Sequence, residues 1–300
     1  MDTSTGCTSP AATQVTRETA ARPWTGVLTA LTGAGSNQVG AAIGAQAFTA
    51  IGPAGVVAVR QLVAAAVLLP VARPKLRSLT WSQWWPVLLL AAVFAGMNLS
   101  LYTAVERIGL ALAVTLEFLG PLAVALVASR SRRDGLTAAL AAVGVYVLVL
   151  PGPASDLTGI ALGLAAAGCW AGYIVVNRLV GTRLDGLQAP ALASGLCALG
   201  YLPVLLLTTT VASWTLPTVV RSLATGLLSS VVPYAADLTA LRTVPPRLFG
   251  ILASAQPVLA ALTGLLLLGQ HLQAHEWVGM AVVITANVVA VTGAAAHRRG

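Results

Sequence analysis

Charged residues are scarce in this 300-residue chain. Only 9% of its residues are charged, whereas 57% are hydrophobic. Soluble domains carry about 25% charged residues, so the composition excludes an ordinary soluble fold. Apolar runs long enough to cross a membrane as helices, which takes about 20 residues, recur along the sequence. The sequence therefore predicts an all-α integral membrane protein.

Cysteine and histidine are also rare. The three cysteines, Cys7, Cys169 and Cys197, form no CxxC pair, and the last two fall inside apolar runs. His271 and His275 are four residues apart, but they lie in a gap between apolar runs, where a position at the membrane interface is the simplest interpretation. Neither a disulfide framework, a metal site nor a cofactor is expected.

Ten apolar runs are long enough to be considered membrane spans. The predicted spans are residues 26–47, 54–72, 84–105, 110–129, 135–151, 158–179, 188–208, 222–240, 248–268 and 276–295. The segment before them, residues 1–24, is polar and lacks a continuous apolar core, so we expect a disordered cytoplasmic tail rather than a cleaved signal peptide.

The basic residues are concentrated in alternate gaps between these spans. Cytoplasmic loops carry an excess of Lys and Arg, so the even-numbered gaps and both termini are predicted to be cytoplasmic. The odd-numbered gaps contain only Arg107 and Arg221, and Arg60 lies inside a span. Because the positive charge is scattered over short loops, nucleic acid is not an expected partner. The basic residues at the ends and in the even gaps are Arg17, Arg22, Arg73, Lys75, Arg77, Arg130, Arg132, Arg133, Arg178, Arg183, Arg242, Arg247, Arg298 and Arg299.

The two halves of the chain resemble each other weakly. An offset of 133 residues aligns Gly26, Leu31, Ala34 and Gly35 with Gly159, Leu164, Ala167 and Gly168, and an offset of 136 aligns Pro121 with Pro257. These matches predict one five-helix repeat at residues 25–151, a second at 152–296 and a basic cytoplasmic C-terminus at 297–300. With five helices each, the repeats have opposite orientations, which is the plan of many secondary transporters with midplane sites.

Three ionisable residues lie inside predicted spans: Arg60, Glu117 and Asp237. A charge at a helix centre costs about 2.5–3.5 kcal/mol on insertion scales, so such residues mark a transport pathway or an ion pair. Glu117 precedes Pro121 by four residues, and the proline weakens the helix beside the carboxylate. We interpret Glu117 as a proton-coupling group that exchanges a proton for a cationic substrate; a structural pair with Arg60 or a backbone amide is the alternative.

Asp237 is the second proton-coupling candidate. It lies three residues after Tyr234, so both side chains share a helix face, although simple solvation at the cytoplasmic end of the span would also explain it. Arg60 could hold a substrate carboxylate with two hydrogen bonds, or it could neutralise Glu117.

Uncharged polar side chains complete a candidate substrate site. Trp170, Tyr173 and Asn177 form one stripe on the sixth span, for which packing or an interfacial belt is the alternative interpretation. Pro121 and Pro257 are predicted helix hinges. The predicted substrate-binding set is Gln38, Arg60, Asn98, Tyr102, Trp170, Tyr173, Asn177, Tyr234 and Gln256.

The segment from Arg107 to Leu126, RIGLALAVTLEFLGPLAVAL, resembles the fourth-helix region of the threonine and homoserine exporters, a branch of the EamA family within the drug/metabolite transporter superfamily. The likeness covers most of residues 35–290. It implies a proton-driven exporter of amino acids or similar metabolites in a bacterial inner membrane. Family members commonly carry Glu where this chain has Gln256 and Gln270, and Glu where it has Asp237.

The leading prediction is a monomeric or homodimeric exporter that works by alternating access. A facilitator or importer of another small metabolite is an alternative, whereas a nucleotide-sugar carrier would favour more basic groups in the cavity than Arg60 alone. A remote alternative is an intramembrane enzyme acting on a lipid-linked substrate. Such an enzyme needs a nucleophile and base, or a metal site, close together, and the sequence offers no clear set.

Overall fold

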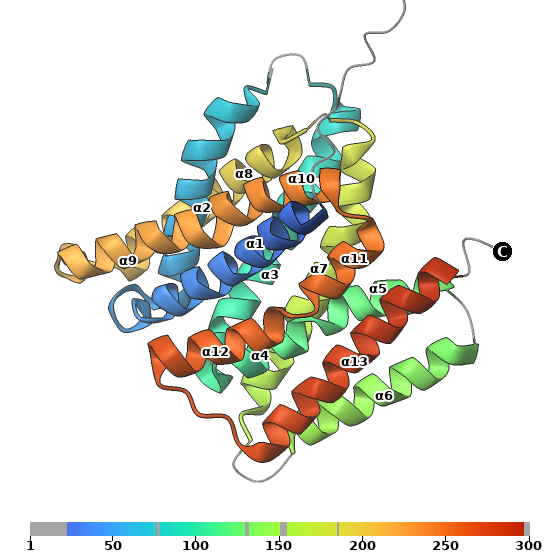
Figure 1. The fold of residues 1–300 in the computed structure, drawn as a ribbon. Helices are drawn as coiled ribbons and strands as arrows, with labels where there is room; N and C mark the ends of the chain where they lie inside the picture. Colours follow the sequence, from blue (N-terminus) through green and yellow to red (C-terminus); the bar gives the residue numbers. More distant parts are fainter. Residues whose placement is uncertain are drawn as a thin grey trace, which may run out of the picture.

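The computed structural model describes residues 23–74, 76, 79–129, 132–150, 155–184 and 186–296. Within these ranges all regular secondary structure is helical (Figure 1). Most of the predicted N-terminal tail and the whole basic C-terminus, residues 297–300, lie outside the described residues.

The helices follow one another with short connections. The first half contains α1 (Pro23–Ala45), α2 (Phe48–Ala72), α3 (Trp81–Ile108), α4 (Leu110–Glu117), α5 (Leu119–Ser129) and α6 (Arg132–Val149). The second half contains α7 (Leu157–Gly181), α8 (Gln188–Thr208), the 3-10 turn η2 (Val211–Ser213), α9 (Leu216–Gly226), the π-helical turn η3 (Leu227–Val231), α10 (Val232–Thr243), α11 (Pro246–Ala253), α12 (Gln256–Leu268) and α13 (Ala274–Ala296).

Eight helical segments in the described part of the chain are long and apolar enough to cross a membrane. A shorter apolar helix, Gly135–Val149, lies within α6. The first predicted span coincides with α1, which is long enough but is not among the eight because Ser36, Asn37 and Gln38 interrupt its apolar sequence. Eight of the ten predicted spans therefore meet both criteria, and the ten-span topology stays a prediction. The eight segments are Phe48–Ala72, Trp81–Ile108, Leu110–Val127, Leu157–Gly181, Gln188–Thr208, Leu216–Asp237, Leu248–Leu268 and Ala274–Thr292.

Several spans predicted as continuous helices are interrupted. The span predicted at 110–129 is divided into α4 and α5, and the span at 248–268 into α11 and α12. α4 ends at Glu117, four residues before Pro121, and α11 ends at Ala253, four residues before Pro257. Since proline has no N–H, the carbonyl four residues earlier loses its helical partner, which explains both interruptions.

The span predicted at 54–72 also begins differently. α2 starts at Phe48 and runs through a kink at Gly52, whose φ of 67° is a conformation that glycine adopts without steric cost. The following residue is Pro53, so the kink lets the chain turn from α1 into the longer straight part of α2.

The most extensive helix contacts join the two halves of the chain. α1 packs against α10, α2 against α8, α3 against α7, and α6 against α13 (Figure 1). The largest buried hydrophobic cluster likewise combines residues of both halves, such as Leu90 and Tyr102 from α3 with Leu192 from α8. The centre of the molecule is thus an interface between the halves.

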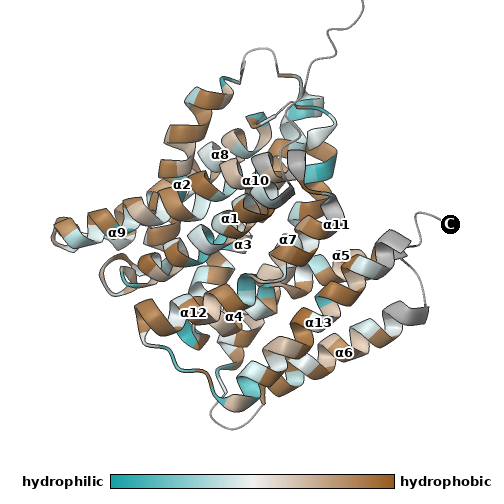
Figure 2. Ribbon diagram, viewed as in Figure 1, coloured by the Kyte–Doolittle hydropathy of each residue, from teal (hydrophilic) through white to brown (hydrophobic). Residues whose placement is uncertain are grey.

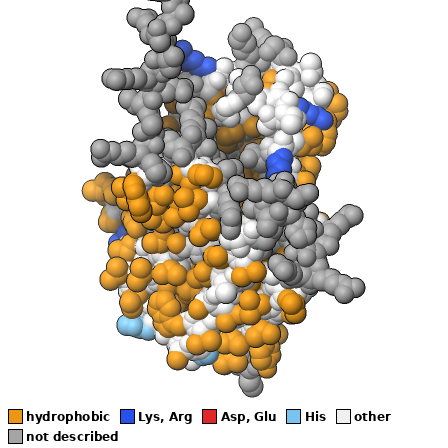
Figure 3. Space-filling view, turned by 45° about the vertical axis from the view of Figure 1, so that its right-hand side comes forward, with side chains coloured by type: hydrophobic (Ala, Val, Ile, Leu, Met, Phe, Trp, Pro, Cys, Tyr) orange, Lys and Arg blue, Asp and Glu red, His pale blue; other side chains and the backbone are white. Residues whose placement is uncertain are grey.

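Apolar side chains cover much of the outer surface. Brown stretches recur along the helices in Figure 2, and hydrophobic side chains cover much of the lower part of the view in Figure 3. Leu207 and Val127 are examples, with exposed fractions of 86% and 75%. In Figure 3 basic side chains gather toward the top of the view and histidines toward the bottom. This distribution is expected of a surface that faces lipid between two polar boundaries.

Candidate functional site

A cavity of about 470 Å³ lies between the two halves. All eleven residues predicted for proton coupling or substrate binding line it, whereas the predicted hinges Pro121 and Pro257 do not. The structure thus brings together side chains from helices far apart in the sequence, although their roles stay predictions. The predicted residues that line the cavity are Gln38, Arg60, Asn98, Tyr102, Glu117, Trp170, Tyr173, Asn177, Tyr234, Asp237 and Gln256.

Neutral groups hold the guanidinium of Arg60. Its Nε donates to Ser230 Oγ at 2.9 Å, its Nη2 to the carbonyl of Ser229 at 2.7 Å and its Nη1 to the hydroxyl of Tyr102 at 3.3 Å. The Tyr102 ring also faces the guanidinium, with Arg60 Cζ 5.5 Å from the ring centroid. The side chain is 9% exposed, so this charge is largely removed from water.

Arg60 contacts no carboxylate among the described residues. Among the described residues the one ion pair within 4 Å joins Arg107 and Asp156, so the alternative in which Glu117 neutralises Arg60 by direct contact is not observed. A buried cation without a counter-charge is unfavourable. The arrangement leaves Arg60 available to an anionic group that enters the cavity.

Pro233 explains one of the contacts of Arg60. Because Pro233 has no N–H, it offers no hydrogen bond to the carbonyl of Ser229 four residues earlier. This position lies in η3, where the helix is locally wider, and the Ser229 carbonyl accepts from Arg60 instead. Ser229 and Ser230 were missing from the predicted site, although two adjacent serines before a proline in an apolar span were an available signal.

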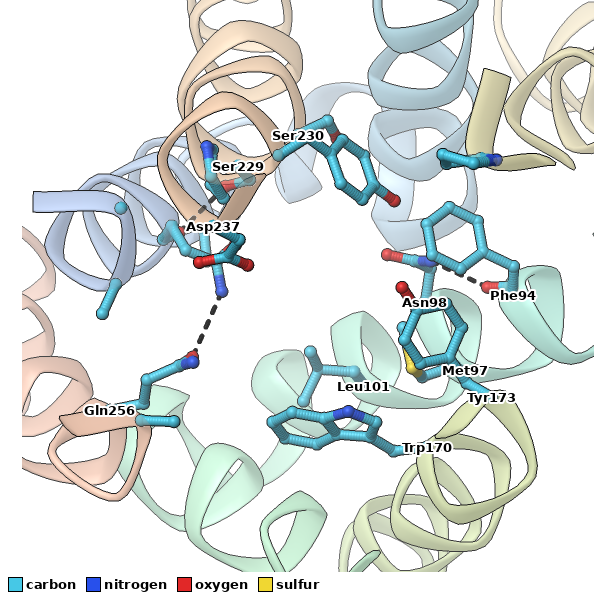
Figure 4. Close-up of a pocket in the computed structure, with 18 of the residues that line it drawn as sticks. Phe94, Met97, Asn98, Leu101, Trp170, Tyr173, Ser229, Ser230, Asp237 and Gln256 are labelled. Carbon is cyan, nitrogen blue, oxygen red and sulfur yellow. Dashed lines mark hydrogen bonds between the residues drawn. The ribbon is translucent and has the colours of Figure 1, made fainter. Parts of the chain in front are cut away.

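The two carboxylates reach the cavity from different elements. Glu117 is the last residue of α4 and is 6% exposed, while Asp237 lies in α10 and is half-buried. In the described part of the chain no hydrogen-bond donor or basic group lies within bonding distance of either. Figure 4 shows Asp237 on the side of the cavity that also carries Gln256, across from Asn98.

Three amide side chains form a group on the same side. Gln38 Nε2 donates to Gln256 Oε1 at 3.0 Å, and Asn37 Nδ2 approaches the same oxygen at 3.4 Å (Figure 4). Gln38 is 2% exposed, and within the part of the chain that the structure describes its own Oε1 is buried without a hydrogen-bond partner. The side-chain carbonyl of Gln256 therefore accepts two hydrogen bonds, whereas Gln38 Oε1 accepts none from the described residues.

Aromatic rings form much of the opposite side. The Phe94 ring centroid lies 5.8 Å from that of Tyr173 and 6.4 Å from that of Tyr234, and Trp170 lies nearby in Figure 4. Asn98 donates through Nδ2 to the Phe94 carbonyl at 2.7 Å. Phe94 was missed because a phenylalanine in a membrane span carries no signal of its own.

The two glutamines that depart from the family pattern have different surroundings. Gln256 lines the cavity, but Gln270 does not. Gln270 Oε1 accepts from the backbone N–H of Leu110 at 3.0 Å and so caps the first turn of α4. Of these two glutamines, only Gln256 bears directly on what the cavity can hold.

Comparison with known proteins agrees with this architecture. The model of the EamA-like transporter family matches residues 157–292. The chain is 33% identical over 268 residues to the threonine/homoserine exporter RhtA of Escherichia coli, covering 88% of this chain and 90% of the relative. The RhtA of Salmonella typhimurium matches to the same extent.

Two more distant likenesses were found. An uncharacterized transporter, YwfM of Bacillus subtilis, is 26% identical over 226 residues, covering 71% of this chain and 76% of the relative. A crystal structure of a protein with 20% identity superposes with a TM-score of 0.61, covering 89% of this chain and 98% of the other. The second likeness concerns the fold alone.

Proposed function

The chain belongs to the EamA-like transporter family, and from this premise we propose that it exports amino acids related to threonine and homoserine across a bacterial inner membrane. Membership of this family identifies a multi-pass membrane transporter and excludes the alternative of an intramembrane enzyme. The relatives named as threonine/homoserine exporters support the substrate class.

The charge pattern of the cavity carries the proposal. It places one cation, Arg60, and two carboxylates, Glu117 and Asp237, around a volume of about 470 Å³, and none of the three forms an ion pair within 4 Å among the described residues. A volume in the range of about 300–1,000 Å³ is typical of small-molecule sites. A zwitterion suits this pattern, because its carboxylate could bind Arg60 with two hydrogen bonds while its ammonium group meets a carboxylate.

Proton antiport follows from the same carboxylates. A proton and the substrate ammonium compete for Glu117 or Asp237, so loading one favours release of the other. Moving one charge through 100 mV is worth about 2.3 kcal/mol, which is sufficient to drive a substrate outward against a gradient of well over tenfold. We propose that proton entry drives export in this way.

We propose that the chain has ten spans in two inverted repeats, residues 25–151 and 152–296, with both termini cytoplasmic. Contacts between helix ends support this topology, since residues in or next to even gaps contact one another, and so do residues in or next to odd gaps. The side chain of Arg183 contacts Ser82, that of Gln46 contacts the carbonyl of Leu267, and Arg107 pairs with Asp156. Each pair belongs to one predicted side of the membrane.

The cavity is proposed to alternate between the two sides. Its lining includes Gly186, Leu187 and Pro190, which lie at the predicted cytoplasmic end. At the other end, Gln270 binds the start of α4 and Gln46 binds the end of α12. This asymmetry supports a conformation open toward the cytoplasm, the side from which an exporter loads.

Efflux from cells tests the function. Cells that overproduce the chain are loaded with labelled threonine, homoserine and a panel of other amino acids, and the label leaving the cells is identified chemically. We expect efflux of unmodified hydroxyl-bearing amino acids that a protonophore abolishes. If overproduction accelerates the efflux of no amino acid, the proposed substrate class is wrong.

A further inference from the structure

The side-chain amides of Gln38 and Gln256 include one donor and one acceptor that make no hydrogen bond among the described residues. Gln38 and Gln256 share a single hydrogen bond, from Gln38 Nε2 to Gln256 Oε1, and the reciprocal bond is not formed. Gln38 Oε1 is a buried acceptor that has no hydrogen-bond partner among the described residues. Gln256 Nε2 donates to no acceptor among the described residues, and Gln256 lines the cavity. A third group that entered between the two amides could bond both the free donor and the free acceptor.

This open pair is connected to the cation site. Arg60 Nη2 donates to the Ser229 carbonyl, and Ser229 Oγ donates to the carbonyl of Asn37 at 2.9 Å. Asn37 Nδ2 in turn approaches Gln256 Oε1. The chain of contacts runs from α2 through η3 and α1 to α12, so two residues, Ser229 and Asn37, connect Arg60 to the amide pair.

We propose that Gln38 and Gln256 form a subsite for the hydroxyl group of the substrate side chain, and this inference rests on the proposed function. The substrate hydroxyl donates to Gln38 Oε1 and accepts from Gln256 Nε2, while the substrate carboxylate binds Arg60. A hydroxyl group can do both at once because it has one donor and two lone pairs. An aliphatic side chain can do neither.

The chemistry of the pair selects against other side chains. Both amides are neutral, so they provide no counter-charge for a side-chain ammonium or carboxylate. A substrate without the hydroxyl would fill the space while leaving Gln38 Oε1 unpaired and Gln256 Nε2 desolvated, and unpaired buried groups are what make such sites selective. The substrate class that fits is a small amino acid with a hydroxyl on a short side chain.

Competition in proteoliposomes tests this subsite. Transport of labelled homoserine by the wild-type chain is inhibited with unlabelled homoserine or with 2-aminobutyrate, which has the same carbon skeleton without the hydroxyl. We expect 2-aminobutyrate to require a concentration about tenfold or more higher for half-inhibition. In Gln38→Leu and Gln256→Leu the ratio should fall toward one, chiefly because homoserine binds more weakly.

Gln61→Leu is the matched control. Gln61, in α2, is likewise a buried glutamine whose amide atoms have no hydrogen-bond partner among the described residues. It does not line the cavity, so this variant should keep the wild-type ratio of the two inhibitory concentrations. A wild-type chain that accepts both compounds at equal concentrations overturns the subsite and leaves the proposed function standing. A wild-type chain that transports neither overturns the proposed function, and the subsite with it. A Gln38→Leu variant that transports homoserine with the wild-type ratio also overturns the subsite.

Discussion

Asp156 serves two helices with one carboxylate. Its Oδ1 accepts from the backbone N–H of Gly159 at 2.8 Å and caps α7, while its Oδ2 pairs with Arg107 at the end of α3, also at 2.8 Å. The pKa of the Asp156 carboxyl is held below its ordinary value mainly by the hydrogen bond from the Gly159 N–H and next by that from the Arg107 side chain. The charged form is therefore the stabilising one.

A pH-dependent stability difference follows. Because the folded-state pKa is lowered, the contribution of Asp156 is complete above the ordinary pKa of an aspartate and is lost as the pH falls through the lowered value. We expect Asp156→Ala to lower the melting temperature of the detergent-solubilised protein at pH 7, and Asp156→Asn, which keeps a capping oxygen, to lower it less. The difference in melting temperature between wild type and Asp156→Ala should become smaller in acid. A difference that becomes larger in acid would contradict this account.

At the residue scale, the ionisable members of the site could be predicted because a charge inside an apolar span is conspicuous. The groups that those charged side chains contact could not be predicted from the sequence. Arg60 and Glu117 are compatible with an ion pair in the sequence, and only the packing of η3 against α2 reveals that Arg60 bonds Ser229 and Ser230 instead. The pattern of neighbouring residues in a sequence does not predict contacts between elements that are far apart in the chain.

At the scale of elements, three prolines accompany the interruptions of the helices around the cavity. Pro121, Pro233 and Pro257 each lie four residues after a residue that lines it, namely Glu117, Ser229 and Ala253. The sequence predicted hinges at Pro121 and Pro257, and the helices are interrupted four residues before each proline, although motion at these points stays a prediction. The extents of the interrupted helices were not predictable, because apolar sequence continues across each interruption.

Pro233→Ala tests the importance of the freed carbonyl. The alanine N–H would restore a helical donor near the Ser229 carbonyl, so Arg60 would lose an acceptor while the helix gains a hydrogen bond. We expect thermal stability to be maintained or raised and homoserine transport to fall several-fold, mainly through a higher half-saturation concentration, since a bond from a charged donor is worth about 1.5–3 kcal/mol. Unchanged half-saturation in a stable variant would show that this carbonyl does not position Arg60 for binding.

At the scale of the whole molecule, the apolar runs predicted where the helices lie but not how the halves meet. The weak internal repeat suggested two similar units, yet the pairing of α1 with α10 and α3 with α7 follows from tertiary packing. That pairing creates the cavity. Hydropathy alone also could not decide whether α1 crosses the membrane. Its polar residues lower its hydropathy, and one of them, Gln38, lines the cavity.

Accessibility of introduced cysteines tests the topology. In a variant whose native cysteines are replaced, Ser82→Cys lies in a predicted cytoplasmic gap and Thr210→Cys in a predicted external gap, and both positions are exposed in the structure. A membrane-impermeant thiol reagent added to intact cells should label Thr210→Cys and spare Ser82→Cys, and inverted membranes should reverse the result. Labelling of both positions from one side would contradict the ten-span arrangement.

Flux driven by a pH gradient in proteoliposomes tests the central claim that the two carboxylates couple substrate to protons. The wild-type chain should move labelled homoserine against its gradient when a pH gradient is imposed, and the double variant Glu117→Gln with Asp237→Asn should lose this gradient-driven transport. Because both carboxylates also belong to the proposed ammonium site, the melting temperature of the detergent-solubilised double variant serves as the control for folding. Gradient-driven flux that is unchanged in the double variant would contradict the account.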